Sequence, residues 1–418
     1  MVTEALNGSA PHWDPYDPAL FADPYPAFRR LREEAPVYYN EQYDFYALSR
    51  YDDVMRGLGD RETFISGKGS TIDIIKHKVP IPDGLFIFHD PPKHANYRGL
   101  LNKMFTPKRV AALEEKIRLF CARSLDPLVE SGEFNFIEHL GLEMPLRVIG
   151  MLIGLPDEDL KAHQTRMNES SRVEPGQQQT SHSLGGEAFE HYIDWRIANP
   201  SDDILTDLLN TEFVDGLGVT RKVTRGEVLV LINLLYGAGN ETTNRLIGWT
   251  GKTLAKFPDQ RRQIVEDRSL IPQAIEEILR YEPPGPSVAR VTSTDVEFHG
   301  VTIPKDSAVL CLVAAANRDE NKFQDGEAFD IHRARVPHLT FGYGFHACIG
   351  NALARIEGRI ALDEVLNRFP EWDVDLANAS LSATVNVRGW ESLPAFTPKA
   401  RPDSVDRSTA VTAAEAPR

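Results

Sequence analysis

Helical periodicity dominates the hydrophobic pattern of this chain. In several long stretches apolar residues recur every three to four positions, which is the pattern of a helix with one buried face. The longest predicted helix has clear ends, because Thr224 and Glu227 form a capping-box pattern and Pro258 stops the run. The predicted helices cover residues 25–33, 107–130, 137–153, 224–256, 269–281 and 351–369.

Runs typical of β-strands are fewer and shorter. Residues 37–39 and 43–49 flank a polar turn and predict a β-hairpin. Residues 67–88 contain Gly, Pro and scattered Ile and predict a long irregular loop. The predicted fold class is therefore mainly α with small β-sheets, an α+β protein. Further strands are predicted at residues 288–296, 301–306, 307–312, 372–375 and 385–396.

Composition indicates one folded unit. The chain has 418 residues, 42% of them hydrophobic, and its interior contains no linker-like stretch. We expect an N-terminal extension at residues 1–20 and a single domain at residues 21–398. Residues 399–418 are rich in Ser, Thr, Ala and Pro and predict a disordered tail.

Charge and cysteine content narrow the functional classes. A formal net charge of −15 argues against sequence-independent binding of nucleic acid. Three cysteines provide no disulfide framework and are typical of a reducing compartment, so we expect a cytoplasmic protein. The first residues lack a signal-peptide pattern and no apolar run reaches the roughly 20 residues of a membrane span, so we expect no membrane anchor.

The strongest chemical signal is the stretch Phe341-Gly342-Tyr343-Gly344-Phe345-His346-Ala347-Cys348-Ile349-Gly350. Its three glycines allow a tight loop. Cys348 lies just before a predicted helix, where free N–H groups and the helix dipole favour a thiolate. Such a thiolate is a nucleophile or a metal ligand. The alternative is a small buried cysteine, which is the usual environment of a free cysteine.

The spacing F-x-x-G-x-H-x-C-x-G resembles the haem-binding loop of the cytochrome P450 family. The resemblance extends over about residues 20–398 and implies the family's fold, with haem b between the long central helix and the helix after the cysteine loop. It implies that Cys348 is the axial iron ligand and that Phe341 packs near its sulfur. Gly350 would allow close backbone approach, and His346 would reach a haem propionate.

Two more segments are candidates for the haem propionates. His94 and Arg98 lie four residues apart and share one helix face after the start signal Asp90-Pro91-Pro92. Spacing alone is also consistent with a solvated pair, whereas the resemblance implies that both bind propionates. Arg290 aligns with another propionate-binding arginine of the family, the alternative being an exposed strand residue.

Unfavourable residues interrupt the long predicted helix at Gly237-Ala238-Gly239-Asn240-Glu241-Thr242-Thr243. Glycines, an acid and two threonines inside a helix indicate function. The alternative is a kink in which threonine hydroxyls bond backbone carbonyls. The motif resembles the family's oxygen-activating groove, which implies that Ala238 and Gly239 make room for dioxygen. Thr242 would hydrogen-bond the oxygen being reduced, and Glu241 would relay protons.

Glu277 and Arg280 form an E-x-x-R pattern, which is weak evidence by itself because a surface ion pair contributes little. The resemblance implies that both join Arg333 in a buried charge network that holds the haem-side scaffold.

The sequence gives the least information about substrate contacts. The resemblance makes residues 67–88 a roof over the substrate and the polar segment 157–200 a mobile lid. Ordinary packing is the alternative for Phe86 and Phe88. The candidate substrate contacts are Phe86, Phe88, Leu234, Val288 and Leu393, with Ser392 as the alternative to Leu393 at the tip of the last hairpin.

The resemblance predicts an O2-dependent monooxygenase that hydroxylates or similarly oxidises a small hydrophobic substrate. No flavin or iron–sulfur module is recognisable, so we expect electrons from ferredoxin and an NAD(P)H-dependent ferredoxin reductase. The alternatives are a peroxide-driven peroxygenase, which the Glu241-Thr242 pair disfavours, and a non-catalytic haem-thiolate sensor or binding protein. The basic residues expected to steer an acidic ferredoxin are Arg98, Lys103, Lys108, Arg109 and Arg355.

Overall fold

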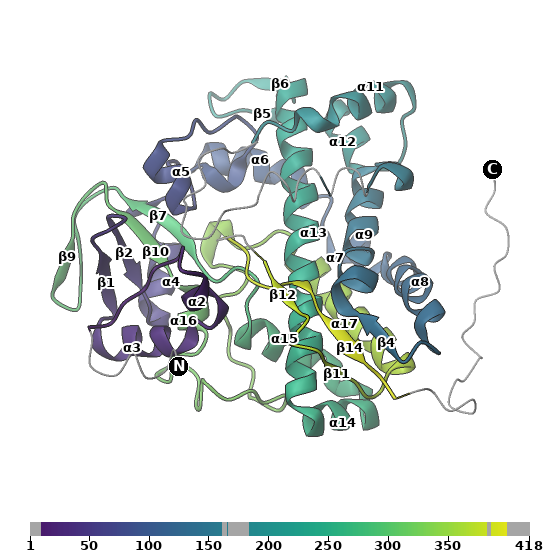
Figure 1. The fold of residues 1–418 in the computed structure, drawn as a ribbon. Coiled ribbons are helices and arrows are strands. Elements are labelled where there is room, and N and C mark those ends of the chain that lie inside the picture. The colour runs from purple at the N-terminus through teal and green to yellow at the C-terminus, as the bar shows by residue number, and fades with distance from the viewer. Residues whose placement is uncertain (1–9, 161–164, 166–183, 383–385, 399–418) are drawn as a thin grey trace.

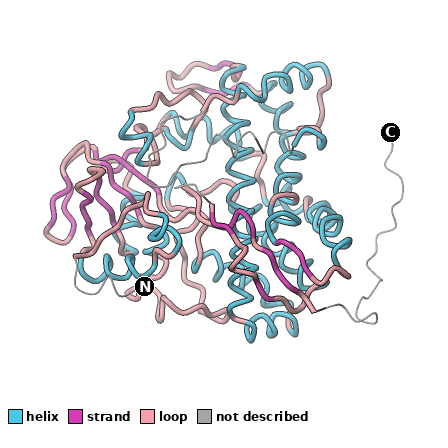
Figure 2. Tube along the Cα trace, viewed as in Figure 1, coloured by secondary structure: helices cyan, strands magenta, loops and turns pink. Residues whose placement is uncertain are grey.

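A long helix, α13 (Arg225–Lys256), crosses the centre of the molecule. In the computed structural model, which describes residues 10–160, 165, 184–382 and 386–398, the largest sheet and the N-terminal helices lie on one side of α13 and a second group of helices lies on the other (Figures 1 and 2). The predicted class, mainly α with small sheets, is confirmed. The predicted tail, and half of the predicted lid at residues 161–164 and 166–183, lie outside the described residues.

The other helices are mostly short. They are α2 (Pro18–Ala22), α3 (Tyr25–Glu34), α4 (Tyr51–Gly59), α5 (Ile72–His77), α6 (Lys93–Asn102), α7 (Pro107–Ala111), α8 (Glu114–Leu125), α9 (Met144–Ile153), α11 (Glu190–Ala198), α12 (Ile204–Asn210), α14 (Pro258–Glu266), α15 (Ile271–Tyr281), α16 (Val313–Ala316) and α17 (Asn351–Arg368), with a π-helix at Phe136–Gly141.

The strands form one five-stranded sheet and several smaller ones. The large sheet has the order β1-β2-β10-β7-β3, and its β1–β2 pair is the predicted hairpin, with Val37 opposite Leu48 and Asn40 opposite Phe45. The strands are β1 (Val37–Asn40), β2 (Phe45–Leu48), β3 (Phe64–Ile65), β4 (Glu133–Asn135), β5 (Glu212–Val214), β6 (Thr220–Lys222), β7 (Val288–Thr292), β8 (Val296–Phe298), β9 (Val301–Ile303), β10 (Ala308–Cys311), β11 (Asp373–Val374), β12 (Ser380–Leu381), β13 (Trp390–Ser392) and β14 (Pro394–Phe396).

Helix α13 has the ends that its sequence predicts. The Thr224 side chain accepts the N–H of Glu227, and the Glu227 carboxylate accepts the N–H of Thr224 at 2.7 Å, so the capping box is complete. The helix packs against α9, the π-helix and α17. Its hydrophobic residues are buried there, which stabilises a helix that would be marginal by itself.

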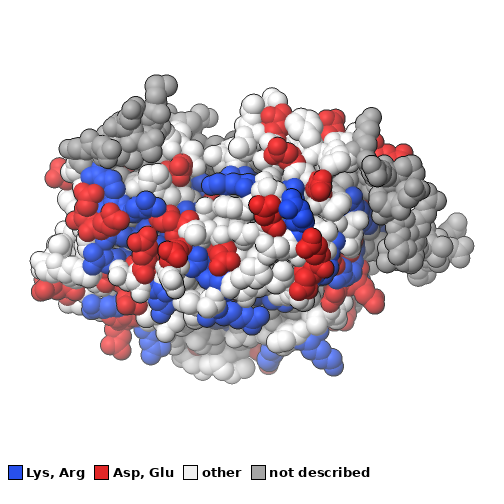
Figure 3. All heavy atoms as spheres, turned by 90° about the horizontal axis from the view of Figure 1, so that it is seen from below, with Lys and Arg blue, Asp and Glu red and all other residues white. Residues whose placement is uncertain are grey.

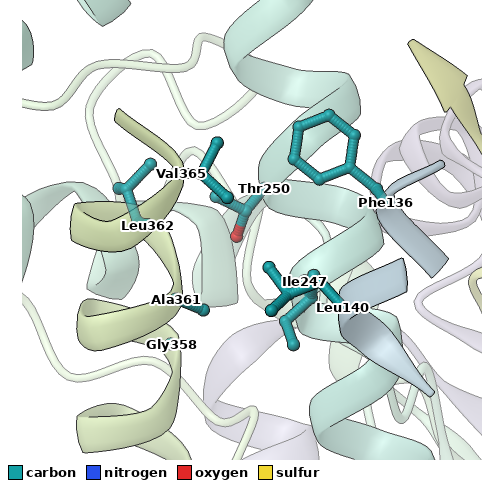
Figure 4. Close-up of a pocket in the computed structure, with 8 residues that line it drawn as sticks. All are labelled: Phe136, Leu140, Ile247, Thr250, Gly358, Ala361, Leu362 and Val365. Carbon is teal, nitrogen blue, oxygen red and sulfur yellow. The ribbon is translucent and has the colours of Figure 1, made fainter. Parts of the chain in front are cut away.

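The interface between α13, α17 and the π-helix is closely packed. A cavity of about 10 Å³ lies between them (Figure 4). That volume is at the lower limit for one water molecule, so the interface contains almost no empty space. The residues that line it are Phe136, Leu140, Ile247, Thr250, Gly358, Ala361, Leu362 and Val365.

Two local predictions need correction. Residues 72–77 form helix α5 inside the stretch expected to be irregular, and Thr71 caps it by accepting the N–H of Ile74. Trp13 and Tyr16 were assigned to an extension, yet both are buried, and the Trp13 ring lies 4.6 Å from that of Phe28. The hydrophobic core therefore includes chain from before residue 21.

Charges of both signs intermingle on the face seen from below in Figure 1 (Figure 3). On that face the net negative charge is therefore not gathered into one acidic field. Across the described residues, none of the helices combines the length and apolar character that crossing a bilayer requires.

Candidate active site

The cysteine loop is a tight structure that ends at the N-terminus of α17. The Cys348 N–H donates to the carbonyl of Phe341 at 2.7 Å, and Asn351 Nδ2 donates to the carbonyl of Cys348 at 2.6 Å. Gly344 has φ of +72°, and a Cβ there would lie 3.3 Å from the Cα of Gly59. Only glycine fits this conformation and this close approach without strain.

Burial controls the ionisation of Cys348. It raises the pKa of the thiol, and it outweighs the N–H of Gly350 and the charges of Arg98 and Arg355, all of which lower that pKa. The prediction that the helix N-terminus favours a free thiolate is therefore wrong in its net direction, because desolvation is the larger effect. A bound metal would reverse the balance, since a coordinating thiol is deprotonated.

Four nitrogen-bearing side chains gather beside this loop. His94, on α6, lies with its ring centroid 4.2 Å from that of His346, and the Nε2 atoms of both are buried without a hydrogen-bond partner. Arg98 donates to the carbonyl of Ala347 at 2.6 Å, and Arg290, on β7, is 3% exposed and donates to its neighbour's carbonyl.

No carboxylate of the described residues forms an ion pair with Arg98 or Arg290. Burial lowers the pKa of both guanidinium groups. Burial also lowers the pKa of His94 to about 4, helped by the charge of Arg98, and that of His346 to about 2, helped by Arg290. Buried cations without a counter-ion are costly. The cluster therefore fits an anionic ligand with several acceptor oxygens, such as the two propionates of haem.

The middle of α13 is less buried than the turns on either side of it. Ala238 is exposed, and Leu234, Gly239, Glu241 and Thr242 are half-buried, although most neighbouring turns are buried. The helix is continuous through this region, and the bond from a threonine hydroxyl to a backbone carbonyl that the alternative named is present. The Thr242 hydroxyl donates to the carbonyl of Ala238 at 2.8 Å, which leaves its oxygen free to accept a further hydrogen bond.

Glu241 is a candidate proton donor. Burial raises its pKa, against the opposing effect of Arg245, whose Nη2 lies 3.5 Å from Glu241 Oε1. A raised pKa brings a carboxylic acid closer to the range in which it can donate a proton at neutral pH. Sequence reasoning missed Arg245, although its i,i+4 spacing from Glu241 is a usable signal.

A second buried acid links the two helices of the site. Glu357, on α17, accepts a hydrogen bond from the Thr243 hydroxyl at 3.3 Å, and burial raises its pKa well above the ordinary value. This contact holds α17, which begins three residues after Cys348, against the motif of α13. Nothing in the sequence singled out Glu357, because its partner is 114 residues away.

The structure brings Glu277, Arg280 and Arg333 together. Arg280 donates two hydrogen bonds of 2.7 Å to the Glu277 carboxylate, and Arg333 Nε donates to it at 3.1 Å. Arg280 also donates to the carbonyls of Asn317, Gly326 and Ala328. Helix α15 is thereby tied to the segment that leads to the cysteine loop.

The candidate substrate contacts divide into two groups. Phe86 and Phe88 are buried at 3% and 5% exposure, with the Phe86 ring 5.9 Å from that of His94, while Leu234 and Val288 are half-buried. Leu393 is fully buried in the main core beside Phe134 and Phe136. Ser392 accepts a hydrogen bond from Asn135. Leu393 and Ser392 thus make structural contacts, and we do not retain them as substrate contacts.

Comparisons with known proteins agree on one family. A family model described as Cytochrome P450 matches residues 188–378. Cytochrome P450 107B1 of Saccharopolyspora erythraea is 34% identical over 407 residues, which cover 93% of this chain and 98% of that protein.

Solved structures give the same result. Cytochrome P450 CYP109Q5 from Chondromyces apiculatus is similar with a TM-score of 0.81 and 34% identity, covering 94% of this chain and all of that one. CYP109E1 from Bacillus megaterium, solved in complex with testosterone, has a TM-score of 0.81 and 29% identity, covering 91% and 99%. The chain therefore belongs to the cytochrome P450 family, and it is a haem-thiolate monooxygenase of the bacterial type that uses haem b.

Proposed function

We propose that Cys348 would ligate the iron of a bound haem and that His94, Arg98, Arg290 and His346 would hold its propionates. The observation that carries this proposal is the unpaired cluster itself: two arginines and two orphaned histidine nitrogens beside the cysteine loop, with no carboxylate partner among the described residues. When bound, a thiolate-ligated haem supplies oxygen activation.

The residues of α13 supply space and protons. Ala238 and Gly239 lack bulky side chains at the accessible part of the helix, which leaves room for dioxygen. Thr242 accepts or donates a hydrogen bond at this position, and Glu241 delivers the proton. Glu277, Arg280 and Arg333 keep the scaffold beneath the loop in place.

The reaction is O2-dependent hydroxylation, or a related oxidation, of a small hydrophobic substrate. The apolar side chains around the site, among them Phe86, Leu234 and Val288, support an apolar ligand. The similarity to an enzyme solved with testosterone supports the same class. We place the enzyme in the cytoplasm, where its three free cysteines stay reduced.

Electrons come from a ferredoxin and its NAD(P)H-dependent reductase. The structure narrows the basic patch expected from the sequence, because Arg98 binds the Ala347 carbonyl and Arg355 pairs with Glu276. Lys103, Lys108 and Arg109 remain exposed. Of these, Arg109 lies 3.4 Å from Asp207. Reversing the charge of these three residues should slow ferredoxin-driven turnover and reduce its salt dependence.

Two measurements test the proposal. The dithionite-reduced protein with carbon monoxide should show the strongly red-shifted Soret band of a thiolate-ligated haem, and its absence from folded, haem-loaded protein would disprove ligation by Cys348. Thr242→Ala should lower product formed per electron consumed with reductant and air. Equal coupling in Thr242→Ala and wild type would remove Thr242 from proton delivery, and product formed only with peroxide would indicate a peroxygenase.

A further inference from the structure

Arg355 contacts the neighbours of Cys348 on both sides of its backbone. The guanidinium lies over the ring of Phe341, 4.4 Å from Cζ to the ring centroid. Its Nη1 donates to Asn351 Oδ1 at 2.9 Å. The Phe341 carbonyl accepts the N–H of Cys348, and Asn351 donates to the carbonyl of Cys348. Arg355 therefore contacts both residues that hydrogen-bond the backbone of the cysteine.

Glu276 fixes the plane of this guanidinium. Arg355 Nε donates to Glu276 Oε1 at 2.6 Å and Nη2 donates to Oε2 at 3.0 Å, which is a bidentate pair. His338 Nε2 lies 3.3 Å from the same carboxylate. A lysine has no planar fork and would keep the charge without this geometry.

The charge of Arg355 acts on the sulfur. The contacts of this side chain with Phe341 and Asn351, which both hydrogen-bond the Cys348 backbone, place a cation close to the cysteine, and a nearby cation favours negative charge on the sulfur. Glu276 places a compensating negative charge beside the cation, and both side chains are 27% exposed. The outer partners of a metal ligand orient it and set the electron density that it donates.

We propose that Arg355 is a positioning residue that holds Cys348 through Phe341 and Asn351 and sets the reduction potential of the site, with Glu276 balancing its charge. The proposal rests on the proposed ligation of haem by Cys348. It assigns to Arg355 a role in supporting the cysteine loop instead of the partner-docking role expected from the sequence.

Removing the charge of Arg355 and removing the charge of Glu276 should shift the reduction potential in opposite directions. Arg355→Gln removes a cation that favours the more negative, reduced state, so the reduction potential should shift downwards. Glu276→Gln leaves the cation unbalanced, so the potential should shift upwards. A role limited to packing would loosen the same contacts in both variants and shift the potential in one direction only.

The experiment is a spectroelectrochemical titration of the full-length, haem-loaded protein. Arg355→Lys should keep the potential closer to wild type than Arg355→Gln does. The control is Arg368→Gln, because Arg368 lies on the same helix with partners Asp126 and Glu364 at 2.6 Å, about 20 Å away by helical rise. It should leave the potential unchanged.

The outcomes separate the two proposals. Shifts in the same direction, or a shift in Arg368→Gln as large as in Arg355→Gln, would overturn the role of Arg355. If Arg355→Gln does not bind haem, Glu276→Gln still decides, because an unchanged or lowered potential there contradicts the charge balance. Loss of the red-shifted carbon monoxide band in wild type would instead overturn ligation by Cys348.

Discussion

Replacing Glu227 by Gln should destabilise the protein in a way that depends on pH. The Glu227 side chain is 4% exposed and accepts hydrogen bonds from Tyr97 at 2.5 Å, from Arg221 at 2.6 and 2.8 Å, and from the capping residue Thr224. Burial raises its pKa, but these donors outweigh burial and lower the pKa from 4.5 to about 2. The ionised carboxylate therefore stabilises the contacts between α6, β6 and α13.

The magnitude follows from the pKa difference between the folded and unfolded chain. At about 1.4 kcal/mol per pKa unit the ionised form contributes about 3 kcal/mol, reduced to roughly 2–3 kcal/mol because Arg221 is 30% exposed and partly screened. Since the folded pKa is the lower one, this stabilisation is complete above pH 4.5 and is lost as the pH falls towards 2.

Urea unfolding followed by tryptophan fluorescence between pH 3 and pH 7 measures the effect. Glu227→Gln should lose roughly 2–3 kcal/mol at pH 7, and its difference from wild type should shrink below pH 4.5. Asp215→Asn is the matched control, because half-buried Asp215 contacts the same Arg221 at 3.0 Å but is not part of the helix cap, so it should cost less. A loss in Glu227→Gln that is equal at pH 3 and pH 7 would refute the reasoning.

Three further predictions address the site and its support. Arg290→Gln should weaken haem retention roughly tenfold or more, measured by haem transfer to apomyoglobin, because it removes a charge-assisted donor; it should also stabilise the haem-free protein, measured by thermal unfolding. Glu277→Gln should cost about 3–5 kcal/mol in urea unfolding, because it leaves buried Arg280 without its carboxylate. Leu140→Ala should cost about 2–5 kcal/mol in the same assay by enlarging the cavity between α13, α17 and the π-helix, whereas Leu217→Ala, at an 89% exposed position, should cost little.

Local signals in the sequence predicted local structure well. The capping box places the start of α13 correctly, and the polar turn between two strand-like runs predicts the β1–β2 hairpin that the structure shows. Helix α5 was missed because its C-terminus has Lys78 in the left-handed region, with φ of +51°, where a glycine would have marked the end. The signal that Thr71 provides as an N-cap was present but stood in a stretch rich in Gly and Pro.

Partners from distant parts of the chain could not be predicted in the same way. Glu227 reads as a capping residue, and nothing in the sequence shows that Tyr97, 130 residues earlier, donates to it. Arg388 reads as part of a closing hairpin, yet it forms a buried 2.7 Å pair with Glu282, which Tyr25 also contacts at 2.7 Å. Each of these contacts depends on how the fold brings distant segments together, which residue types and local spacing do not show.

The residues of the candidate site also come from distant parts of the chain, although their types indicated its chemistry. His94, Arg98, Arg290 and His346 come from α6, β7 and the cysteine loop, and only the fold brings them to one place. A cluster of this kind would destabilise a protein that bound nothing there, because its two histidine Nε2 atoms have no hydrogen-bond partner and its arginines have no carboxylate partner among the described residues. Residues kept at such a cost are retained for a ligand, and the ligand's binding energy must offset the cost. The missing hydrogen-bond and ion-pair partners of the cluster thus support the proposal, made from the sequence motif, that these residues bind an anionic group.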